Sequence, residues 1–183
     1  MEPYLTRWWT RPDQHRPLPY MCAAHAAYLG DLAAKATLAV EWGAGGSTLF
    51  IACLMGKDCQ LLAIESDPTW LRWTQNAIFC FERADFDMAK VALIDDPGCN
   101  LEPQLSNVDL VLVDGPIQDR PREMRLGWGL LRPGGSLLLH DAQRSFYTAS
   151  KAKLVASGGQ VAYESLDDMG ACLWHAKKAV SPR

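Results

Sequence analysis

A glycine-rich turn between an apolar strand and an apolar helix constrains the fold of this chain more than any other feature. The short apolar run 38–40 leads into Glu41-Trp42-Gly43-Ala44-Gly45-Gly46-Ser47-Thr48, and apolar residues follow again at 49–52. This order predicts a buried strand, a sharp turn and a helix. Glycines permit the turn and leave the backbone open to a ligand, and the helix N-terminus offers unpaired N–H groups. The turn therefore predicts an α/β domain with a ligand at this corner.

Other apolar runs also end in polar side chains that can do chemistry. The runs are residues 60–64 before Glu65, 90–94 before Asp95 and Asp96, 108–113 before Asp114, and 136–139 before His140 and Asp141. Each run is short enough for a buried strand. In an open parallel sheet, ligands bind outside the carboxyl ends of the strands. We therefore expect these side chains to gather at one edge of the sheet.

In this order, the motifs resemble those of the class I S-adenosylmethionine-dependent methyltransferases. The matching pieces are Glu41-x-Gly43-x-Gly45-Gly46, Glu65, Asp114-Gly115-Pro116 and Leu131-Arg132-Pro133-Gly134-Gly135. The resemblance implies S-adenosylmethionine as the cofactor. The nearest analogy is the catechol O-methyltransferase group of small-molecule enzymes, which implies methyl transfer to oxygen.

The last part of the chain distinguishes this arrangement from a purely parallel sheet. Residues 160–165 and 171–175 read as two strands, and the link between them, 166–170, is too short for a parallel crossover. The pair must be an antiparallel hairpin. We expect an α/β, Rossmann-like three-layer sandwich, with a seven-stranded, mostly parallel sheet and a C-terminal antiparallel hairpin.

We expect one domain over residues 1–183, with an irregular proline-rich arm at 1–19, a helix at 20–36 and the Rossmann-like core at 37–177. The arm is either packed on the domain or a lid over the site. Helical spacing of Met21, Ala24, Tyr28 and Leu32 predicts the stripe of the first helix that faces the core. Further helices are expected at 46–56, from Pro68 onward, at 121–131 and at 145–156.

Composition excludes several classes of protein. Eighteen basic and twenty-one acidic side chains give a net charge of −3, which does not favour nucleic-acid binding through phosphates. No apolar run is long enough to cross a bilayer, and the first residues lack the apolar core of a signal peptide. Six cysteines without a C-x-x-C pair indicate neither a zinc site nor a disulfide framework. We expect a cytoplasmic protein without membrane or nucleic-acid partners, and a homo-oligomer stays open.

The resemblance implies cofactor contacts along the turn and at three strand ends. Glu65 would accept hydrogen bonds from the ribose, and Asp95 or Asp96 one from the adenine amino group. Trp70 would either cover the adenine or pack in the core beside Trp73. The expected cofactor residues are Glu41, Trp42, Gly43, Ala44, Gly45, Gly46, Ser47, Thr48, Glu65, Ser66, Trp70, Asp95 and Asp114.

The expected catalytic residues are Asp114, His140 and Asp141. His140 is either a general base or a residue that hydrogen-bonds a neighbouring loop. Asp114 and Asp141 stand in positions that resemble those of the metal-binding acids of the catechol group, which implies a divalent cation such as Mg²⁺. Ala142, however, stands where that group has an asparagine. Three arginines at 120, 122 and 125 either form a solvated helix face or contact an anionic or sugar group of the acceptor.

The leading interpretation is methyl transfer to a small-molecule acceptor, with two rivals from other classes. A dinucleotide-dependent oxidoreductase would need glycine at the sixth position counted from Gly43, where Thr48 stands. A protein that binds S-adenosylmethionine or S-adenosylhomocysteine without catalysis would carry the same turn. A nucleic-acid methyltransferase fits less well, because Asp114-Gly115-Pro116 replaces the expected N/D-P-P-Y motif.

Overall fold

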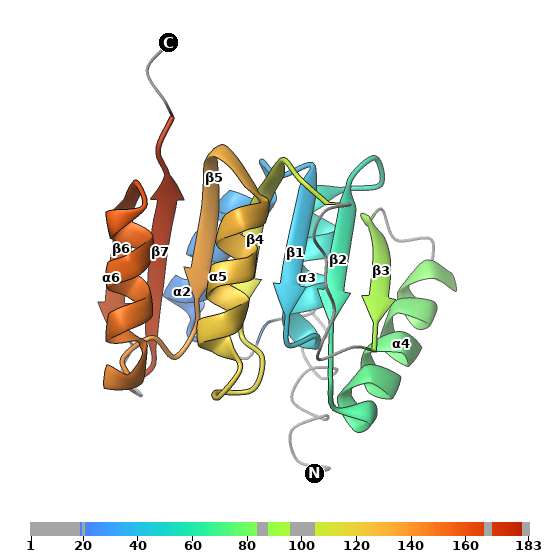
Figure 1. Ribbon diagram of the computed structural model, residues 1–183. Helices are drawn as coiled ribbons and strands as arrows, with labels where there is room; N and C mark the ends of the chain where they lie inside the picture. Colours follow the sequence, from blue (N-terminus) through green and yellow to red (C-terminus); the bar gives the residue numbers. More distant parts are fainter. Residues whose placement is uncertain (1–18, 20, 84–87, 96–104, 167–169, 181–183) are drawn as a thin grey trace.

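A computed structural model describes residues 19, 21–83, 88–95, 105–166 and 170–180 (Figure 1). The expected N-terminal arm, apart from Pro19, lies outside these residues. Within them, no helix is both long and apolar enough to cross a membrane.

A single seven-stranded sheet forms the middle layer (Figure 1). Its strand order is β3-β2-β1-β4-β5-β7-β6. Strands β1 to β5 pair in parallel, whereas β7 pairs antiparallel with both β5 and β6. The strands are β1 Leu38–Trp42, β2 Gln60–Ile64, β3 Lys90–Ile94, β4 Val108–Val113, β5 Leu131–Leu139, β6 Gly159–Leu166 and β7 Cys172–Lys178.

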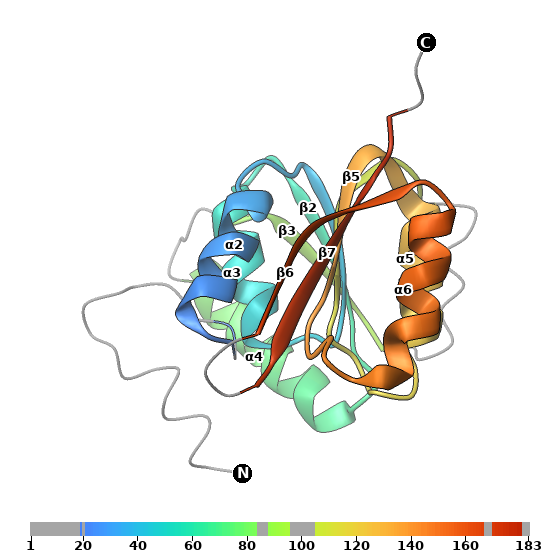
Figure 2. The same ribbon diagram turned by 90° about the vertical axis from the view of Figure 1, so that its left-hand side faces the viewer.

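Helices cover both faces of the sheet, which gives three layers (Figure 2). One face carries α2 Ala23–Ala33, α3 Gly46–Met55 and α4 Pro68–Arg83, and the other carries α5 Arg120–Leu130 and α6 Thr148–Ala156. A short 3₁₀ helix, Ser145–Tyr147, leads into α6. These observations confirm the expected fold class, including the closing hairpin.

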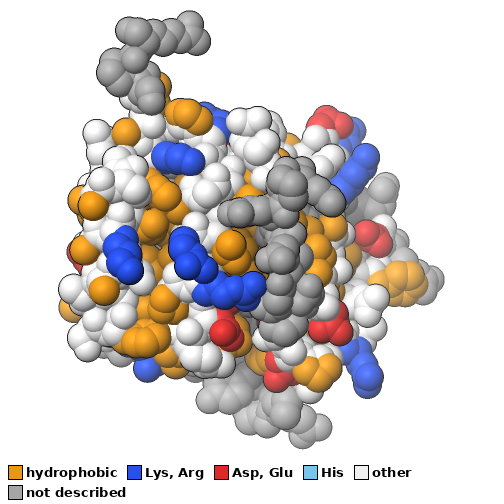
Figure 3. All heavy atoms as spheres, in the orientation of Figure 1, with side chains coloured by type: hydrophobic (Ala, Val, Ile, Leu, Met, Phe, Trp, Pro, Cys, Tyr) orange, Lys and Arg blue, Asp and Glu red, His pale blue; other side chains and the backbone are white. Residues whose placement is uncertain are grey.

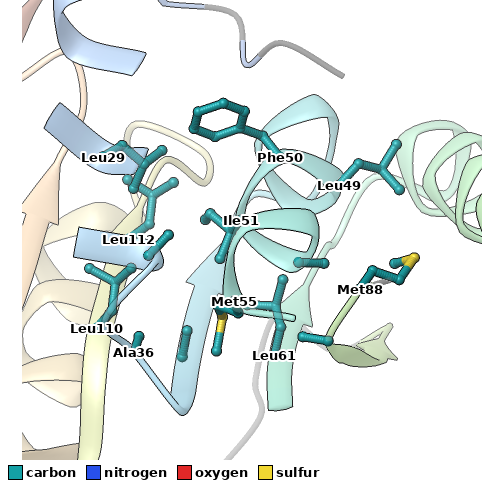
Figure 4. Close-up of a cluster of buried hydrophobic side chains, with 14 of the residues drawn as sticks. Leu29, Ala36, Leu49, Phe50, Ile51, Met55, Leu61, Met88, Leu110 and Leu112 are labelled. Carbon is teal, nitrogen blue, oxygen red and sulfur yellow. The ribbon is translucent and has the colours of Figure 1, made fainter. Parts of the chain in front are cut away.

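The core consists of two apolar clusters, one on each side of the sheet. Strand β4 contributes to both because successive side chains of a strand point to opposite faces. Leu110 and Leu112 pack with Leu29 and Ile51 from the helices of one face (Figure 4), while Val111 and Val113 belong to the other cluster. A strand buried on both faces reads as a continuous apolar run, which is why β4 was predictable.

Two local expectations differ in part from the structure. Of the stripe expected on the first helix, Met21, Tyr28 and Leu32 pack against the core, whereas Ala24 is exposed. The fully buried residues of α2 are His25, Ala26, Leu29 and Ala33. This helix is apolar nearly all round, so periodicity alone does not choose the face. Strand β5 begins at Leu131, five residues before the expected Ser136, and the pairing with β4 is interrupted between these two residues. Gly134, at φ +83°, lies in this irregular segment.

Candidate active site

A cavity of about 580 Å³ lies at the carboxyl ends of β1, β2 and β4. Its volume falls in the usual range of about 300–1,000 Å³ for small-molecule and cofactor sites. The turn after β1, the end of β2, the first turn of α4 and the end of β4 supply its walls. The lining residues are Met21, Gly43, Ala44, Gly45, Gly46, Ser47, Glu65, Asp67, Trp70, Trp73, Asp114, Gly115 and Pro116.

Glu41 holds the glycine-rich turn from behind. Its side chain is fully buried, and the hydroxyls of Ser47 and Thr48 hydrogen-bond its two carboxyl oxygens at 2.5 and 2.6 Å. The Gly45 N–H in turn donates to Thr48 Oγ1 at 2.8 Å. Burial raises the pKa of Glu41 to about 8 despite these hydrogen bonds. The carboxyl is therefore mostly protonated at neutral pH, and it fixes the turn without lining the cavity.

Two glycines of the turn have different surroundings. Gly43 has φ +89°, and a Cβ there would lie only 2.7 Å from the Gly115 nitrogen. Gly45 is extended, and a Cβ there would meet no protein atom within 4 Å, although the residue lines the cavity. Gly43 is therefore required by the close approach of the chain after β4, whereas Gly45 leaves open space in the cavity.

The end of β2 presents a carboxylate to the cavity. Glu65 is 7 % exposed, its Oε1 accepts a hydrogen bond from the Asp67 N–H at 2.7 Å, and burial raises its pKa. Asp67 caps α4 by accepting from the N–H groups of Thr69 and Trp70, as its position before Pro68 predicts. One oxygen of Glu65 is thus fixed by the turn.

Trp70 and Trp73 both line the cavity, with their rings edge-to-face at 5.6 Å. Trp70 is 43 % exposed, so the alternative that it packs in the core is wrong. Helical spacing had suggested core packing for these tryptophans. They line the cavity because the first turns of α4 lie beside it.

Several expected cofactor residues lie away from this cavity. Trp42 packs in the core cluster beneath α5, and Thr48 is buried beside Glu41. Ser66 borders a separate small recess. Asp95 is exposed at the end of β3 and is not among the lining residues, and Asp96 lies outside the part of the chain that the structure describes.

The ends of β4 and β5 bring the three expected catalytic residues together. Asp114 Oδ1 lies 3.2 Å from His140 Nδ1, and a potential ligand atom from each of Asp114, His140 and Asp141 lies within 4.8 Å of the others. Asp114 alone of the three lines the cavity. Asp141 has φ +54°, a left-handed conformation that is uncommon outside glycine but tolerated by aspartate.

Arg120, the first residue of α5, binds this cluster together and is 5 % exposed. Its Nη2 donates to Asp114 Oδ1 at 2.8 Å, and Nη1 lies 3.8 Å from Asp141 Oδ2. It also donates to the carbonyls of Gly115 at 2.7 Å and His140 at 2.6 Å. The solvated helix face expected for this arginine is wrong, although Arg125 is exposed on the same helix. Figure 3 shows Lys and Arg side chains on this face of the molecule.

His140 is 6 % exposed, and its surroundings act on its pKa in opposite directions. Burial, the largest single effect, lowers the pKa, but the hydrogen bond and charge of Asp114, together with the charge of Asp141, raise it above its ordinary value. When Nδ1–H donates to Asp114, Nε2 keeps its lone pair. Nε2 has no hydrogen-bond partner among the described residues.

Glu123, one turn into α5, is a second buried acid that sequence reasoning missed. It is 5 % exposed, and its Oε1 would lie 2.5 Å from a Cβ on Gly115. Burial raises its pKa to about 8. Nothing in the sequence distinguishes it from an ordinary surface glutamate in the first turn of a helix.

Asp114, His140 and Asp141 do not fit a divalent cation while Arg120 lies among them. A guanidinium already contacts Asp114 and lies near Asp141. Two unit charges about 4 Å apart repel by about 4 kcal/mol at an effective dielectric constant of about 20, so Arg120 would oppose a divalent ion with roughly twice that and offset much of the attraction from the two carboxylates. Catalysis at this site would therefore depend on the protein's own side chains.

Comparisons with known proteins agree with the sequence motifs. No family model matches the chain. It is 33 % identical over 111 residues to a "Putative O-methyltransferase" of Mycobacterium sp. (strain JLS), covering 60 % of this chain and 49 % of that protein. A protein of the same name from Mycobacterium avium (strain 104) is 33 % identical over 110 residues, covering 59 % and 48 %. The chain thus spans about half the length of the curated relatives it matches.

Solved structures share the fold. The O-methyltransferase TomG from Streptomyces achromogenes, in complex with S-adenosylmethionine, superposes with a TM-score of 0.66 at 17 % identity, covering 87 % of this chain and 82 % of that one. An O-methyltransferase from Bacillus cereus, in complex with S-adenosylhomocysteine, also gives 0.66, at 16 % identity, covering 88 % and 84 %. These likenesses confirm the fold that the sequence motifs indicated.

Proposed function

We propose that this chain, which has the fold of the class I S-adenosylmethionine-dependent methyltransferases, binds S-adenosylmethionine and transfers its methyl group to an oxygen of a small-molecule acceptor. The observation that carries the proposal is the cavity, where the open space at Gly45 and the carboxylates of Glu65 and Asp114 face one volume. We expect this reaction in the cytoplasm.

The residues of the cavity fit the cofactor's chemistry. The buried carboxylate of Glu65 suits two ribose hydroxyls, and the Trp70 and Trp73 rings offer apolar surface for adenine. The turn before α3 presents backbone rather than side chains to the amino-acid part. Asp95 remains our proposed contact for the adenine amino group. Because it does not line the cavity, its side chain would have to move toward the ligand.

When bound, S-adenosylmethionine supplies the methyl group on a positively charged sulfonium. Acidic side chains at the strand ends suit this charge, and positioning can supply much of the rate acceleration. Asp114 would orient the acceptor hydroxyl from the cavity wall. His140 Nε2 would take the hydroxyl proton, directly or through one water, and Asp114 would stabilise the imidazolium through Nδ1–H.

Ligand-dependent thermal unfolding tests the cofactor assignment. S-adenosylhomocysteine should raise the melting temperature as its concentration exceeds Kd, and NAD should leave it unchanged. Stabilisation by NAD alone would favour the oxidoreductase. Stabilisation by neither ligand would remove the proposal.

A second candidate is a protein that binds the cofactor without catalysis. The burial of His140, which does not line the cavity, favours this reading. Methyl transfer from labelled S-adenosylmethionine to a panel of phenols distinguishes an active methyltransferase from a protein that only binds the cofactor. If His140 is the base, His140→Ala should lower the rate by about 10²-fold or more with cofactor affinity little changed. Equal rates in the wild type and His140→Ala would exclude His140 as the general base.

A further inference from the structure

The strongest unassigned feature is the buried guanidinium of Arg120 between the ends of β4 and β5. Its Nε and Nη1 are committed to the carbonyls of Gly115 and His140, and Nη2 contacts Asp114. Five N–H donors in a rigid fork make arginine suited to bind several oxygens at once. The group therefore has a fixed place, set by main-chain oxygens from both strands.

This place coincides with the one that a divalent cation would need. The ligand atoms of Asp114, His140 and Asp141 are close enough to hold an ion. Arg120 Nη2 already contacts the same Asp114 oxygen that lies near His140 Nδ1, and Nη1 lies on the side of Asp141. The residue after Asp141 is Ala142, which is buried and offers no oxygen from its side chain. The two acids thus have Arg120 as a counter-ion, and the residue after Asp141 provides no side-chain oxygen to a cation.

We propose that Arg120 takes the place of a divalent cation in this site, so that the protein works without a metal. The statement that catalysis proceeds without a metal rests on the proposed function, whereas the position of Arg120 does not. Arg120 is a positioning residue: it neutralises part of the charge of Asp114 and Asp141 and ties the two strand ends together. The guanidinium donates hydrogen bonds and, unlike a metal ion, offers no coordination position to an acceptor.

The proposal also bears on the acceptor. A divalent cation could bind two neighbouring oxygens of an acceptor and make its hydroxyl more acidic. Arg120 is not a Lewis acid and cannot coordinate acceptor oxygens as a metal does, and its Nε, Nη1 and Nη2 already contact protein oxygens. The acceptor then needs only one hydroxyl, which loses its proton to a protein base. Phenols with a single hydroxyl, whose pKa is near that of tyrosine, about 10, fit this requirement.

Manganese binding to the cofactor-free protein tests the proposal independently of methyl transfer. The electron paramagnetic resonance signal of free Mn²⁺ falls when the ion binds. Wild-type protein should leave this signal unchanged at millimolar Mn²⁺. Arg120→Ala should gain a site at least about tenfold tighter than any in the wild type, because the repelling charge is gone, and Asp141→Asn in that background should remove it. Arg125→Ala, exposed on the same helix, is the matched control and should behave as wild type.

Stoichiometric Mn²⁺ binding by the wild type, lost in Asp141→Asn, would overturn the proposal. So would a folded Arg120→Ala protein that gains no site. Where Arg120→Ala fails to fold, the wild-type titration decides. Binding of S-adenosylhomocysteine to the same wild-type sample is measured by calorimetry before and after chelator treatment. It distinguishes failure of the proposed function from failure of the role proposed for Arg120. No binding refutes the proposed function and leaves the manganese result standing, whereas binding that requires added metal refutes the role of Arg120.

Discussion

Gly43 and Gly45 lie two residues apart in one turn, and a methyl group would meet different surroundings at each. Gly45→Val should fold normally and lose cofactor binding, because its backbone is extended and the side chain would project into the cavity. Gly43→Ala should instead lower the free energy of unfolding, by about 1 kcal/mol or more, because of its positive φ and the nearby Gly115 backbone. Urea unfolding and calorimetry with S-adenosylhomocysteine measure both effects. Intact binding in Gly45→Val would show that the cofactor lies elsewhere.

Glu65 is the second residue where a single substitution is informative. Glu65→Gln keeps an oxygen for the Asp67 N–H but loses the charge. Hydrogen bonds to charged groups contribute about 1.5–3 kcal/mol, so affinity for S-adenosylhomocysteine should fall about 10- to 100-fold, with stability little changed. Glu82→Gln, exposed further along α4, is the matched control. Equal affinities in the two variants would refute the ribose contact.

At the scale of residues, the sequence predicted the polar groups at strand ends better than those on helices. Glu65 and Asp114 follow apolar strands, so their place at the sheet edge depends on local pattern alone. The burial of Arg120 and Glu123 depends instead on how α5 packs against the ends of β4 and β5. The partner carbonyl of His140 lies twenty residues away from Arg120, and no spacing rule reveals such a contact.

At the scale of elements, a polar contact attaches α2 to the closing hairpin. The Tyr28 hydroxyl and His175 Nδ1 form a hydrogen bond of 2.7 Å, and the Tyr28 ring stacks on Tyr163. Burial lowers the pKa of His175 to about 4, so the ring is neutral and can accept at neutral pH. Tyr28→Phe keeps the stacking and leaves the buried His175 Nδ1 without this hydrogen-bond partner.

The expected result for Tyr28→Phe is a loss of about 1–3 kcal/mol in the free energy of unfolding, with unchanged affinity for S-adenosylhomocysteine. Urea unfolding at pH 7 measures the first and calorimetry the second. Val155→Ala, at an exposed position of α6, should change neither. A Tyr28→Phe protein as stable as the wild type would show that the hydrogen bond contributes nothing.

The elements themselves were largely predictable, because most apolar runs here are buried strands with clear turn residues between them. Errors arose where the local pattern is ambiguous. In α2 small apolar residues occur on every side, so packing against α3 and the hairpin selects the buried face. In β5 the Pro133-Gly134-Gly135 segment reads as a turn, yet strand pairing with β4 extends back to Leu131.

At the scale of the whole molecule, buried acids make stability depend on pH. The pKa values of Glu41 and Glu123 are raised to about 8 by burial, whereas an unfolded glutamate titrates near pH 4.3. Between these values the native state holds protons that the unfolded state has lost. Stability should therefore fall as pH rises through this window, by about 1.4 kcal/mol per pH unit for each group, and level off above pH 8.

Glu123→Gln tests this dependence. The variant should match the wild type at pH 5, exceed it in stability at pH 8, and show a flatter profile between, as measured by urea unfolding. Glu82→Gln serves again as the exposed control. The lowered pKa of His175 acts in the other direction, so that stability is also lost as pH falls from about 6.5 to about 4. Parallel profiles for Glu123→Gln and the wild type would show that Glu123 is ionised in the folded protein.

The two halves of the site differ in when they can form. The hydrogen bonds that fix the glycine-rich turn join residues only three to seven positions apart. The hydrogen bond from Arg120 to the His140 carbonyl instead joins residues twenty positions apart. Short loops are cheap to close, and the N-terminal part of a chain leaves the ribosome first. The end of the site assigned to the cofactor would then take shape while the catalytic end is still being synthesised. Pulse-labelled hydrogen exchange during refolding should protect the Gly45 amide before that of His140, which donates to the Val113 carbonyl.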